Sequence, residues 1–371
     1  MRHDLRRPVP HRAVLLLVLF VLAATRPVPA SPPVETLVSG LDVPWALAFA
    51  PDGRLFVTER RGRLRVVAEG RLQPEPVATL PVYADGESGL MGLALDPAFA
   101  QNGHLYVCYS TLAGSALIDR ALGRGPRINR LSRLTLRQGR AGAERVLIDA
   151  MPGAWNHDGC RVKFGPDGKL YATMGDAADP PLAQRLDSPA GKIHRLEADG
   201  SIPPDNPFRR SADAAPSVWS LGHRNPQGLA WDAAGRLYAS EHGPSGHDEI
   251  NLIQPGKNYG WPEAFGRARM PGDRFVDPIL ESSSRDTWAP SGMAFLGGHL
   301  YVAGLRGQRL LRVTLGADGG VTGVAPMFTG TYGRLRDVVV GPDGALYVAT
   351  NNRDGRGSPR PDDDRILRVI P

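Results

Sequence analysis

The sequence predicts an all-β fold, and three observations carry that prediction. Forty-four Gly and 34 Pro make up about a fifth of the 371 residues, which favours many tight turns over long helices. One phrase, a Gly-containing turn followed by a short strand of alternating apolar and aromatic residues, occurs six times along the chain. The 42 % hydrophobic and 22 % charged fractions are typical of a globular protein with a sizeable core.

The repeated phrase is PDGRLFV in its first copy, at residues 51–57. The leucines of the six copies are Leu55, Leu105, Leu170, Leu237, Leu300 and Leu346. Successive copies are therefore 50, 65, 67, 63 and 46 residues apart, a spacing that suits four-stranded sheets with insertions. Six sequential sheets around an axis make a six-bladed β-propeller, which we expect as a single domain over residues 31–371.

A second amphipathic strand follows most copies, as at residues 63–67, 192–196 and 309–313, so each copy predicts a hairpin. The strand expected at residues 34–39 can pair with residues 366–370 in the last blade. This pairing would close the ring without a free sheet edge. The longer insertions, such as residues 111–128 and 263–286, are expected to be loops on the faces of the central channel.

The N-terminus has the order of a secretory signal peptide. Residues 1–12 are basic, residues 13–24 are an unbroken apolar run, and small residues precede Ser31. Twelve apolar residues fall short of the roughly 20 that span a bilayer. We therefore expect residues 1–30 to be a signal peptide cleaved near Ala30, leaving no membrane span, and the protein to be periplasmic or secreted.

The charge of the mature chain argues against nucleic acid as a partner. The whole sequence carries a net charge of +6, but residues 1–30 hold five Arg against one Asp, a net +4, which leaves +2. A near-neutral protein lacks the clustered positive charge that binds phosphates or an anionic membrane.

The two cysteines, Cys108 and Cys160, could pair or remain as thiols, because disulfides are allowed outside the cytoplasm. Two buried free thiols are slightly favoured, since a fold of this size needs no covalent cross-link.

The first candidate site is the segment NHDGCR at residues 156–161, followed by Gly175 and Asp176. The unperturbed pKa of histidine is close to neutrality, so His157 is a candidate general base. A carboxylate from the end of the next strand, Asp176, could orient its ring. The alternative is a histidine that only makes a hydrogen bond to a neighbouring blade.

Two further segments are GHRNPQG at residues 222–228 and EHGPSGHDE at residues 241–249. The backbone carbonyls of Gly243 and Pro244, with Glu241 and Asp248 nearby, supply the hard oxygen ligands that calcium prefers. Zinc is disfavoured, because histidines spaced i, i+5 beside a proline match no recognised zinc pattern. The structural alternative is a turn with solvated charges.

A fourth cluster is basic and contains Arg306, Arg334 and Arg336. Arg334 and Arg336 alternate on one strand, so their guanidinium groups are expected to face the same way and to bind carboxylates. A surface pair of arginines is the alternative.

Taken together, these clusters resemble the soluble quinoprotein aldose and glucose dehydrogenases, six-bladed propellers that use pyrroloquinoline quinone (PQQ) and calcium. The likeness runs from about Val34 to the C-terminus. Its segments, in chain order, are GLDVPW at 40–45, GLMGLA at 89–94, His157 with Asp176, GKI at 191–193, IPPDNP at 202–207, GHRNPQG at 222–228, EHGP at 241–244, DEIN at 248–251, NYGWP at 258–262 and RLRD at 334–337.

The resemblance implies a role for each matching position. The catalytic base falls on His157 and its supporting acid on Asp176. The quinone-contacting residues fall on Arg224, Asn225, Arg306, Arg334 and Arg336, and the calcium-binding carbonyls on Gly243 and Pro244. Glu87 stands where glucose-oxidising members carry a substrate-contacting Gln, and Cys160 stands where a Gly is common.

The resemblance also implies the reaction, the oxidation of an aldose sugar at its anomeric carbon to a lactone. The sequence has no Cys-x-x-Cys-His haem motif, so electrons are expected to leave to a separate external acceptor. A calcium-dependent propeller lactonase and a non-catalytic binding propeller are the competing interpretations. The sequence does not specify the physiological sugar, the acceptor or the oligomeric state.

Overall fold

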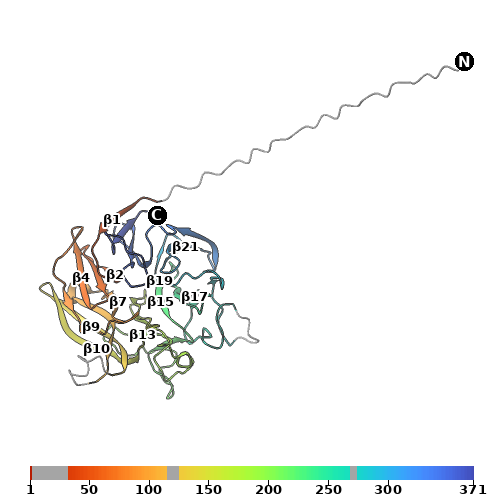
Figure 1. The fold of residues 1–371 in the computed structure, drawn as a ribbon. Helices are drawn as coiled ribbons and strands as arrows, with labels where there is room; N and C mark the ends of the chain where they lie inside the picture. The colour runs from red at the N-terminus through yellow and green to blue at the C-terminus, as the bar shows by residue number, and fades with distance from the viewer. Residues whose placement is uncertain (2–31, 115–124, 268–273) are drawn as a thin grey trace. The chain divides into compact units, whose positions relative to one another are not determined.

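The computed structural model describes residue 1 and residues 32–114, 125–267 and 274–371. The predicted signal peptide, residues 1–30, therefore lies outside the described residues apart from Met1. From residue 32 onwards the described chain forms six sheets around a common centre, as Figure 1 shows. No helix in the described part of the chain is long and apolar enough to cross a membrane. The predicted six-bladed β-propeller is confirmed.

Five blades follow the chain order, each starting with its innermost strand. The first comprises β2 (Pro44–Phe49), β3 (Leu55–Glu59), β4 (Arg63–Ala68) and β5 (Arg71–Leu72), with β6 (Ala78–Thr79) also paired to β4. The second comprises β7 (Leu90–Leu95), β8 (His104–Leu112), β9 (Arg127–Arg137) and β10 (Arg140–Pro152), and the third β11 (Val162–Phe164), β12 (Leu170–Met174), β13 (Lys192–Leu196) and β14 (Val218–Leu221). The fourth comprises β15 (Pro226–Trp231), β16 (Leu237–Glu241), β17 (Glu249–Ile253) and β18 (Leu280–Glu281), and the fifth β19 (Pro290–Leu296), β20 (His299–Gly304), β21 (Arg309–Leu315) and β22 (Val321–Met327).

The sixth blade is built from both ends of the described chain. Its strands are β23 (Leu335–Val340), β24 (Leu346–Thr350), β25 (Ile366–Val369) and β1 (Val34–Val38). β1 pairs with β25 in antiparallel register, with Val34 opposite Val369. The predicted closure of the ring by these two segments is confirmed.

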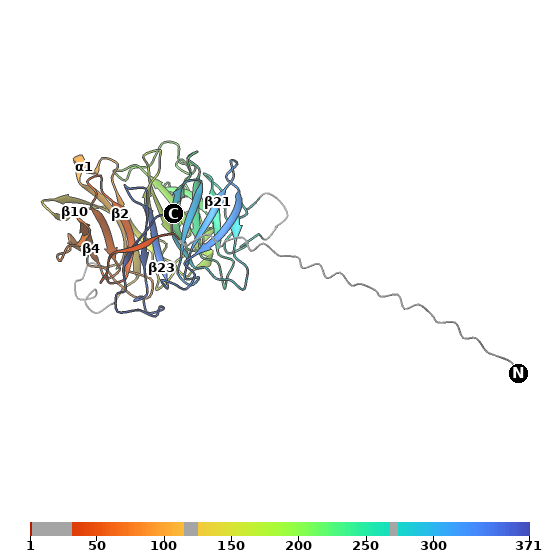
Figure 2. The same cartoon turned by 90° about the horizontal axis from the view of Figure 1, so that it is seen from above.

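The innermost strands meet at the centre of the ring. β2 contacts β7 and β23, β7 contacts β11, and β19 contacts both β15 and β23. Figure 1 looks along the ring axis, and Figure 2 turns it by 90° so that the strands are seen from the side. Regular structure outside the sheets is limited to α1 (Phe99–Asn102) and the 3₁₀ turn η1 (Pro180–Ala183) in the described residues.

The structure explains why the repeated phrase pairs a leucine with an aromatic residue. Its leucines and the aromatic residues that follow them are all buried. The hydroxyl of Tyr106 donates to Asp96 at 2.8 Å, and that of Tyr238 donates to Asp232 at 3.0 Å. A buried tyrosine needs such a partner for its hydroxyl. The Asp at the turn and the Tyr on the strand therefore recur together.

The expectation of two free thiols is wrong, because Cys108 and Cys160 form a disulfide. Cys108 lies on β8 and Cys160 just before β11, so the bond joins the second blade to the third. Their Cα atoms are 5.4 Å apart, within the range that a disulfide bridges. The size of the fold says only that it needs no cross-link. Which side chains face each other between blades depends on packing that local sequence does not reveal.

Candidate active site

The predicted site residues lie where the first strand of a blade begins and its second strand ends. These two strands are antiparallel, so the beginning of one and the end of the other lie at the same edge of a blade. His157 precedes β11, and Asp176 follows β12. Arg224 precedes β15, and Arg334 precedes β23. The propeller thus presents the predicted residues on one face.

His157 and Asp176 form a hydrogen-bonded pair. Nδ1 of His157 lies 2.8 Å from Oδ1 of Asp176, whose side chain is fully buried. The second carboxylate oxygen of Asp176 accepts a hydrogen bond of 2.8 Å from the indole N–H of Trp261. When Nδ1 donates to the carboxylate, Nε2 is the ring nitrogen free to take a proton, and the His157 side chain is 13 % exposed. This is the geometry of a general base held by an orienting carboxylate.

The backbone around His157 is folded tightly against the end of β12. His157 and Cys160 both have positive φ, 60° and 62°, a region that residues other than glycine adopt infrequently. A Cβ on Gly175 would lie 1.9 Å from the carbonyl oxygen of His157, so only glycine permits this approach. The position of the base therefore depends on one residue that carries no side chain.

Glu87 reaches the same segment from the loop before β7. Its Oε2 accepts hydrogen bonds from the backbone N–H of His157 at 3.3 Å and from Nδ2 of Asn225 at 3.5 Å. Its Oε1 accepts one from Nη1 of Arg356 at 2.6 Å. Burial by itself would raise the pKa of Glu87, but its interaction with His242, the hydrogen bond and charge of Arg356, and the charge of Arg336 outweigh burial and lower that pKa to about 2. Glu87 is therefore an anion beside the candidate base.

Asn225 and Arg224 connect the fourth blade to the base. Oδ1 of Asn225 accepts a hydrogen bond of 3.1 Å from the backbone N–H of Gly159, two residues after His157. The guanidinium of Arg224 lies over the ring of Trp261, 5.2 Å from its centroid, and donates to the carbonyl of His242 at 3.3 Å. Trp261 thus contacts both the orienting carboxylate and a predicted quinone-binding residue.

Arg334 and Arg336 are buried rather than exposed on the surface. Arg334 donates to Oδ2 of Asp354 from Nε at 2.9 Å and from Nη2 at 2.8 Å. Arg336 donates to Oε1 of Gln227 at 2.8 Å. Burial lowers the pKa of Arg336 to about 9, and the nearby charge of Arg334 adds to that effect. Two guanidinium groups close together in a buried site favour an anionic ligand.

Arg306 is placed apart from this set. It lies exposed in the turn between β20 and β21, at the same edge of the blades. No described contact joins it to the other predicted residues.

The predicted calcium ligands divide into two groups. The carboxylates are already used within the protein: Glu241 accepts from the backbone N–H of Arg224 and from Nδ1 of His223, and Asp248 accepts from the backbone N–H groups of Gly243 and Ala289. The carbonyl oxygens of Gly243 and Pro244 accept no hydrogen bond from the described residues. No group of three or more His, Cys, Asp or Glu side chains with metal-binding geometry occurs in the described ranges. A cation at this place would therefore rest on backbone carbonyls, which suit calcium.

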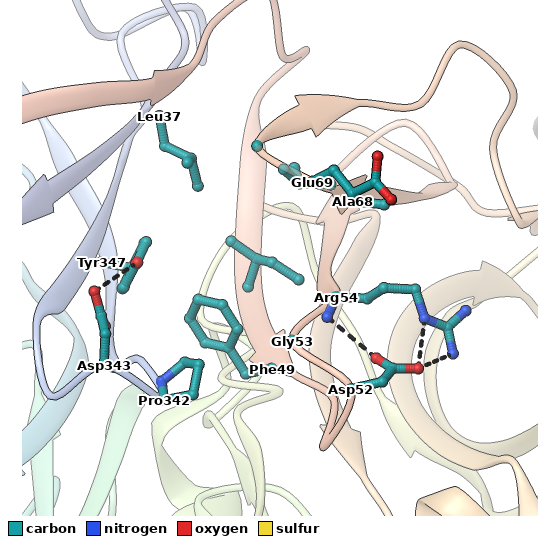
Figure 3. Close-up of a pocket in the computed structure, with 13 residues that line it drawn as sticks. Leu37, Phe49, Asp52, Gly53, Arg54, Ala68, Glu69, Pro342, Asp343 and Tyr347 are labelled. Atoms are coloured by element: carbon teal, nitrogen blue, oxygen red, sulfur yellow. Dashed lines mark hydrogen bonds and ion pairs between the residues drawn. The ribbon is translucent and has the colours of Figure 1, made fainter.

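A pocket of about 600 Å³ lies elsewhere, between the first and sixth blades. Figure 3 shows its aromatic walls, Phe49 and Tyr347, and the ion pair of Asp52 with Arg54 at its rim. Its lining includes none of the predicted site residues. A smaller pocket is lined by residues of the predicted site, among them Arg224, His242, Gly243, Pro244 and Trp261.

Sequence reasoning missed several residues of this site. Arg60, Asp354 and Arg356 carry charges that act on the same groups. Nε atoms of Arg60, Arg224 and Arg336 are buried without a hydrogen-bond partner in the described structure. Arg60 follows directly after β3, at the blade edge where the other site residues lie, and that position was the one signal available.

Comparison with known proteins shows which family the chain resembles in sequence and fold. Residues 41–367 match the family described as Glucose / Sorbosone dehydrogenase. The aldose sugar dehydrogenase YliI of Escherichia coli (strain K12) is 36 % identical over 371 aligned positions, which cover 93 % of this chain and 97 % of that protein. Quinoprotein glucose dehydrogenase B of Acinetobacter calcoaceticus is 34 % identical over 62 % of this chain and 52 % of its own length. The PQQ-bound structure of an aldose sugar dehydrogenase from Streptomyces coelicolor superposes with a TM-score of 0.80 at 38 % identity, covering 92 % of this chain and 98 % of that one.

Proposed function

Because the chain belongs to the glucose/sorbosone dehydrogenase family, we propose that it oxidises aldose sugars at the anomeric carbon, with PQQ and calcium as cofactors. The product is a lactone, and the electrons pass to an external acceptor. The observation that carries this proposal is the hydrogen-bonded pair of His157 and Asp176. The same site contains buried guanidinium groups whose Nε atoms have no hydrogen-bond partner among the described residues.

The chain's residues fit an anionic quinone. PQQ carries three carboxylates, and the Nε atoms of Arg60, Arg224 and Arg336 are buried donors with no hydrogen-bond partner among the described residues. A buried donor without a partner costs free energy that an incoming carboxylate recovers. Arg224, Asn225, Arg334 and Arg336 are proposed to hold the quinone. Arg306 would need to turn inward to join them.

The chemistry divides between the cofactor and His157. PQQ, when bound, supplies the two-electron acceptor that protein side chains lack. Nε2 of His157 takes the proton of the anomeric hydroxyl, and the carboxylate of Asp176 stabilises the imidazolium. Losing this proton, and the carbon-bound hydrogen with its electron pair, converts a cyclic aldose into a lactone. Glu87 accepts a hydrogen bond from a sugar hydroxyl.

Calcium is proposed on the carbonyl oxygens of Gly243 and Pro244. Calcium takes about six to eight oxygen ligands, so water or cofactor oxygens complete its shell. Glu241 and Asp248, committed to backbone N–H groups, shape the segment that presents these carbonyls. They are therefore proposed to act as supports for the ion site, although the sequence alone favoured them as ligands.

We also propose that the protein is exported, with residues 1–30 removed as a signal peptide. The disulfide between Cys108 and Cys160 supports an oxidising compartment such as the periplasm or the medium. The N-terminal sequence and intact mass of protein recovered outside the cytoplasm test the cleavage site.

Reconstitution tests the proposed activity. Protein produced without PQQ should gain dye-linked aldose oxidation when PQQ and calcium are added together, and little when either is added alone. A lactone should appear in step with the reduced dye. Activity that ignores both PQQ omission and a calcium chelator would contradict the proposal, and lactone hydrolysis by the same sample would favour a propeller lactonase.

A further inference from the structure

A short segment after β24 contacts two parts of the site at once. Arg356 reaches Glu87, which lies on a loop distant in sequence and touches the backbone of His157. Asp354, two residues earlier, holds Arg334. These contacts join the side of the site that holds the base to the side proposed to hold the quinone.

The carboxylate of Glu87 is largely withdrawn from water and needs a cation. Its side chain is 15 % exposed, whereas that of Arg356 is 45 % exposed. Nη1 of Arg356 lies 2.6 Å from Oε1 of Glu87, a charge-assisted hydrogen bond. The remaining oxygen of Glu87 faces the N–H of His157 and the amide of Asn225.

Asp354 fixes the place from which Arg356 acts. Its Oδ1 accepts a hydrogen bond of 2.9 Å from the backbone N–H of Arg356. Its Oδ2 accepts two from Arg334, and its side chain is 3 % exposed. A movement of this turn would therefore displace the hydrogen-bond partners of both Arg334 and Glu87.

Two other arginines interact electrostatically with Glu87. Arg336 lowers its pKa electrostatically, and Arg60 interacts with both Glu87 and Arg356. Without Arg356, the buried carboxylate would be left uncompensated, and a neighbouring guanidinium would have to neutralise it. The neighbours available include Arg336, which the proposed function assigns to the quinone.

We propose that Arg356 is a positioning residue that holds Glu87 in place and keeps Glu87 from drawing Arg336 and Arg60 away from the quinone. Arg356 itself touches neither substrate nor cofactor. This inference rests on the proposed function for its catalytic consequence, and on the Glu87–Arg356 ion pair for its structural one.

The test compares Arg356→Gln, Glu87→Gln and the double variant, with Arg356→Lys as the conservative change. Arg360→Gln is the matched control, because Arg360 is exposed on the same loop and its guanidinium makes no contact in the described structure. PQQ affinity is measured by absorbance titration, with kcat and KM for an aldose and the melting temperature of the apo protein.

Arg356→Gln should weaken PQQ binding about 10- to 100-fold, the scale of a lost interaction between charged groups, and lower kcat. The double variant should bind PQQ as Glu87→Gln does, because no unpaired carboxylate is left, and this non-additivity is the signature of the coupling. Arg356→Lys should retain most of the affinity, and Arg360→Gln should match the wild type.

Two results would contradict the inference. If the double variant binds PQQ no better than Arg356→Gln, then Arg356 contacts the cofactor directly and the inference is wrong. If Arg356→Gln equals the wild type, it is also wrong. Should the wild type bind no PQQ, the proposed function fails. The apo melting temperature then still tests the ion pair, because Arg356→Gln should lower it and the double variant should restore it.

Discussion

Gly175 lies so close to His157 that a Cβ at its position would be 1.9 Å from the carbonyl oxygen of His157. The same Cβ would lie 3.1 Å from the carbonyl oxygen of Arg224. The backbone of His157 can therefore pack against the end of β12 only because residue 175 has no side chain.

Gly175→Ala should displace the His157 segment and reduce turnover sharply, because backbone atoms cannot yield as a flexible side chain does. Turnover at saturating PQQ is the measurement. Gly142→Ala on β10 is the control, since a Cβ there meets nothing within 4 Å and its backbone is unstrained. Equal turnover in the two variants would show that the segment tolerates displacement.

His157→Ala should lower turnover by roughly 10²- to 10⁴-fold, the usual share of general base catalysis, while PQQ still binds. Asp176→Asn should give a smaller loss, because the base itself is still present. The amide lacks the charge that stabilises an imidazolium, and its one oxygen can accept a hydrogen bond from only one of His157 and Trp261. Steady-state turnover is measured with PQQ saturation checked by absorbance. Near-normal turnover in His157→Ala would reduce the histidine to a structural hydrogen-bonding group.

Glu87 should make stability depend on pH in a defined window. Its pKa falls from 4.5 to about 2 on folding, because nearby cations outweigh the effect of burial. A carboxyl with a lowered folded pKa stabilises the fold above its unfolded pKa, and this contribution is lost as the pH falls.

The difference in free energy of unfolding between the wild type and Glu87→Gln should therefore stay constant above pH 4.5 and change progressively between pH 4.5 and about 2. Urea titrations across this range measure it. Glu75→Gln, at an exposed position, is the control variant. A difference that is flat down to pH 2 would mean that folding does not lower the pKa of Glu87.

Replacing both Cys108 and Cys160 by Ala should lower the free energy of unfolding by about 2–4 kcal/mol, the usual contribution of a disulfide. Turnover should fall as well, since Cys160 lies three residues from His157. Chemical denaturation gives the first quantity. Under denaturing, non-reducing conditions the wild type should take up no iodoacetamide, and uptake of two equivalents would show free thiols instead.

Much of the fold could be predicted from the local pattern of the sequence. The six leucines and their aromatic neighbours repeat at intervals that only a ring of similar sheets explains, and the closing strands follow from where the pattern starts and stops. The pairing of His157 with Asp176 was accessible as well, because both sit at strand ends in one blade.

The remainder depends on contacts between distant segments. Nothing near Glu87 in the sequence indicates that Arg356 will neutralise it, and nothing near Cys108 indicates Cys160. Asp248 looks like a metal ligand until the backbone N–H groups of Gly243 and Ala289 are found on its oxygens. Composition cannot tell a carboxylate that is free to bind an ion from one that holds a loop.

The pairing of β1 with β25 also sets the order in which the molecule can be completed. During synthesis β1 leaves the ribosome first among the strands, yet its partner is the last to emerge. Five blades can assemble from neighbouring hairpins, whereas the sixth must wait for nearly the entire chain. Truncation of either end would therefore open the ring at the same seam, and a circular permutant that joins both ends within one continuous blade should refold faster than the natural order.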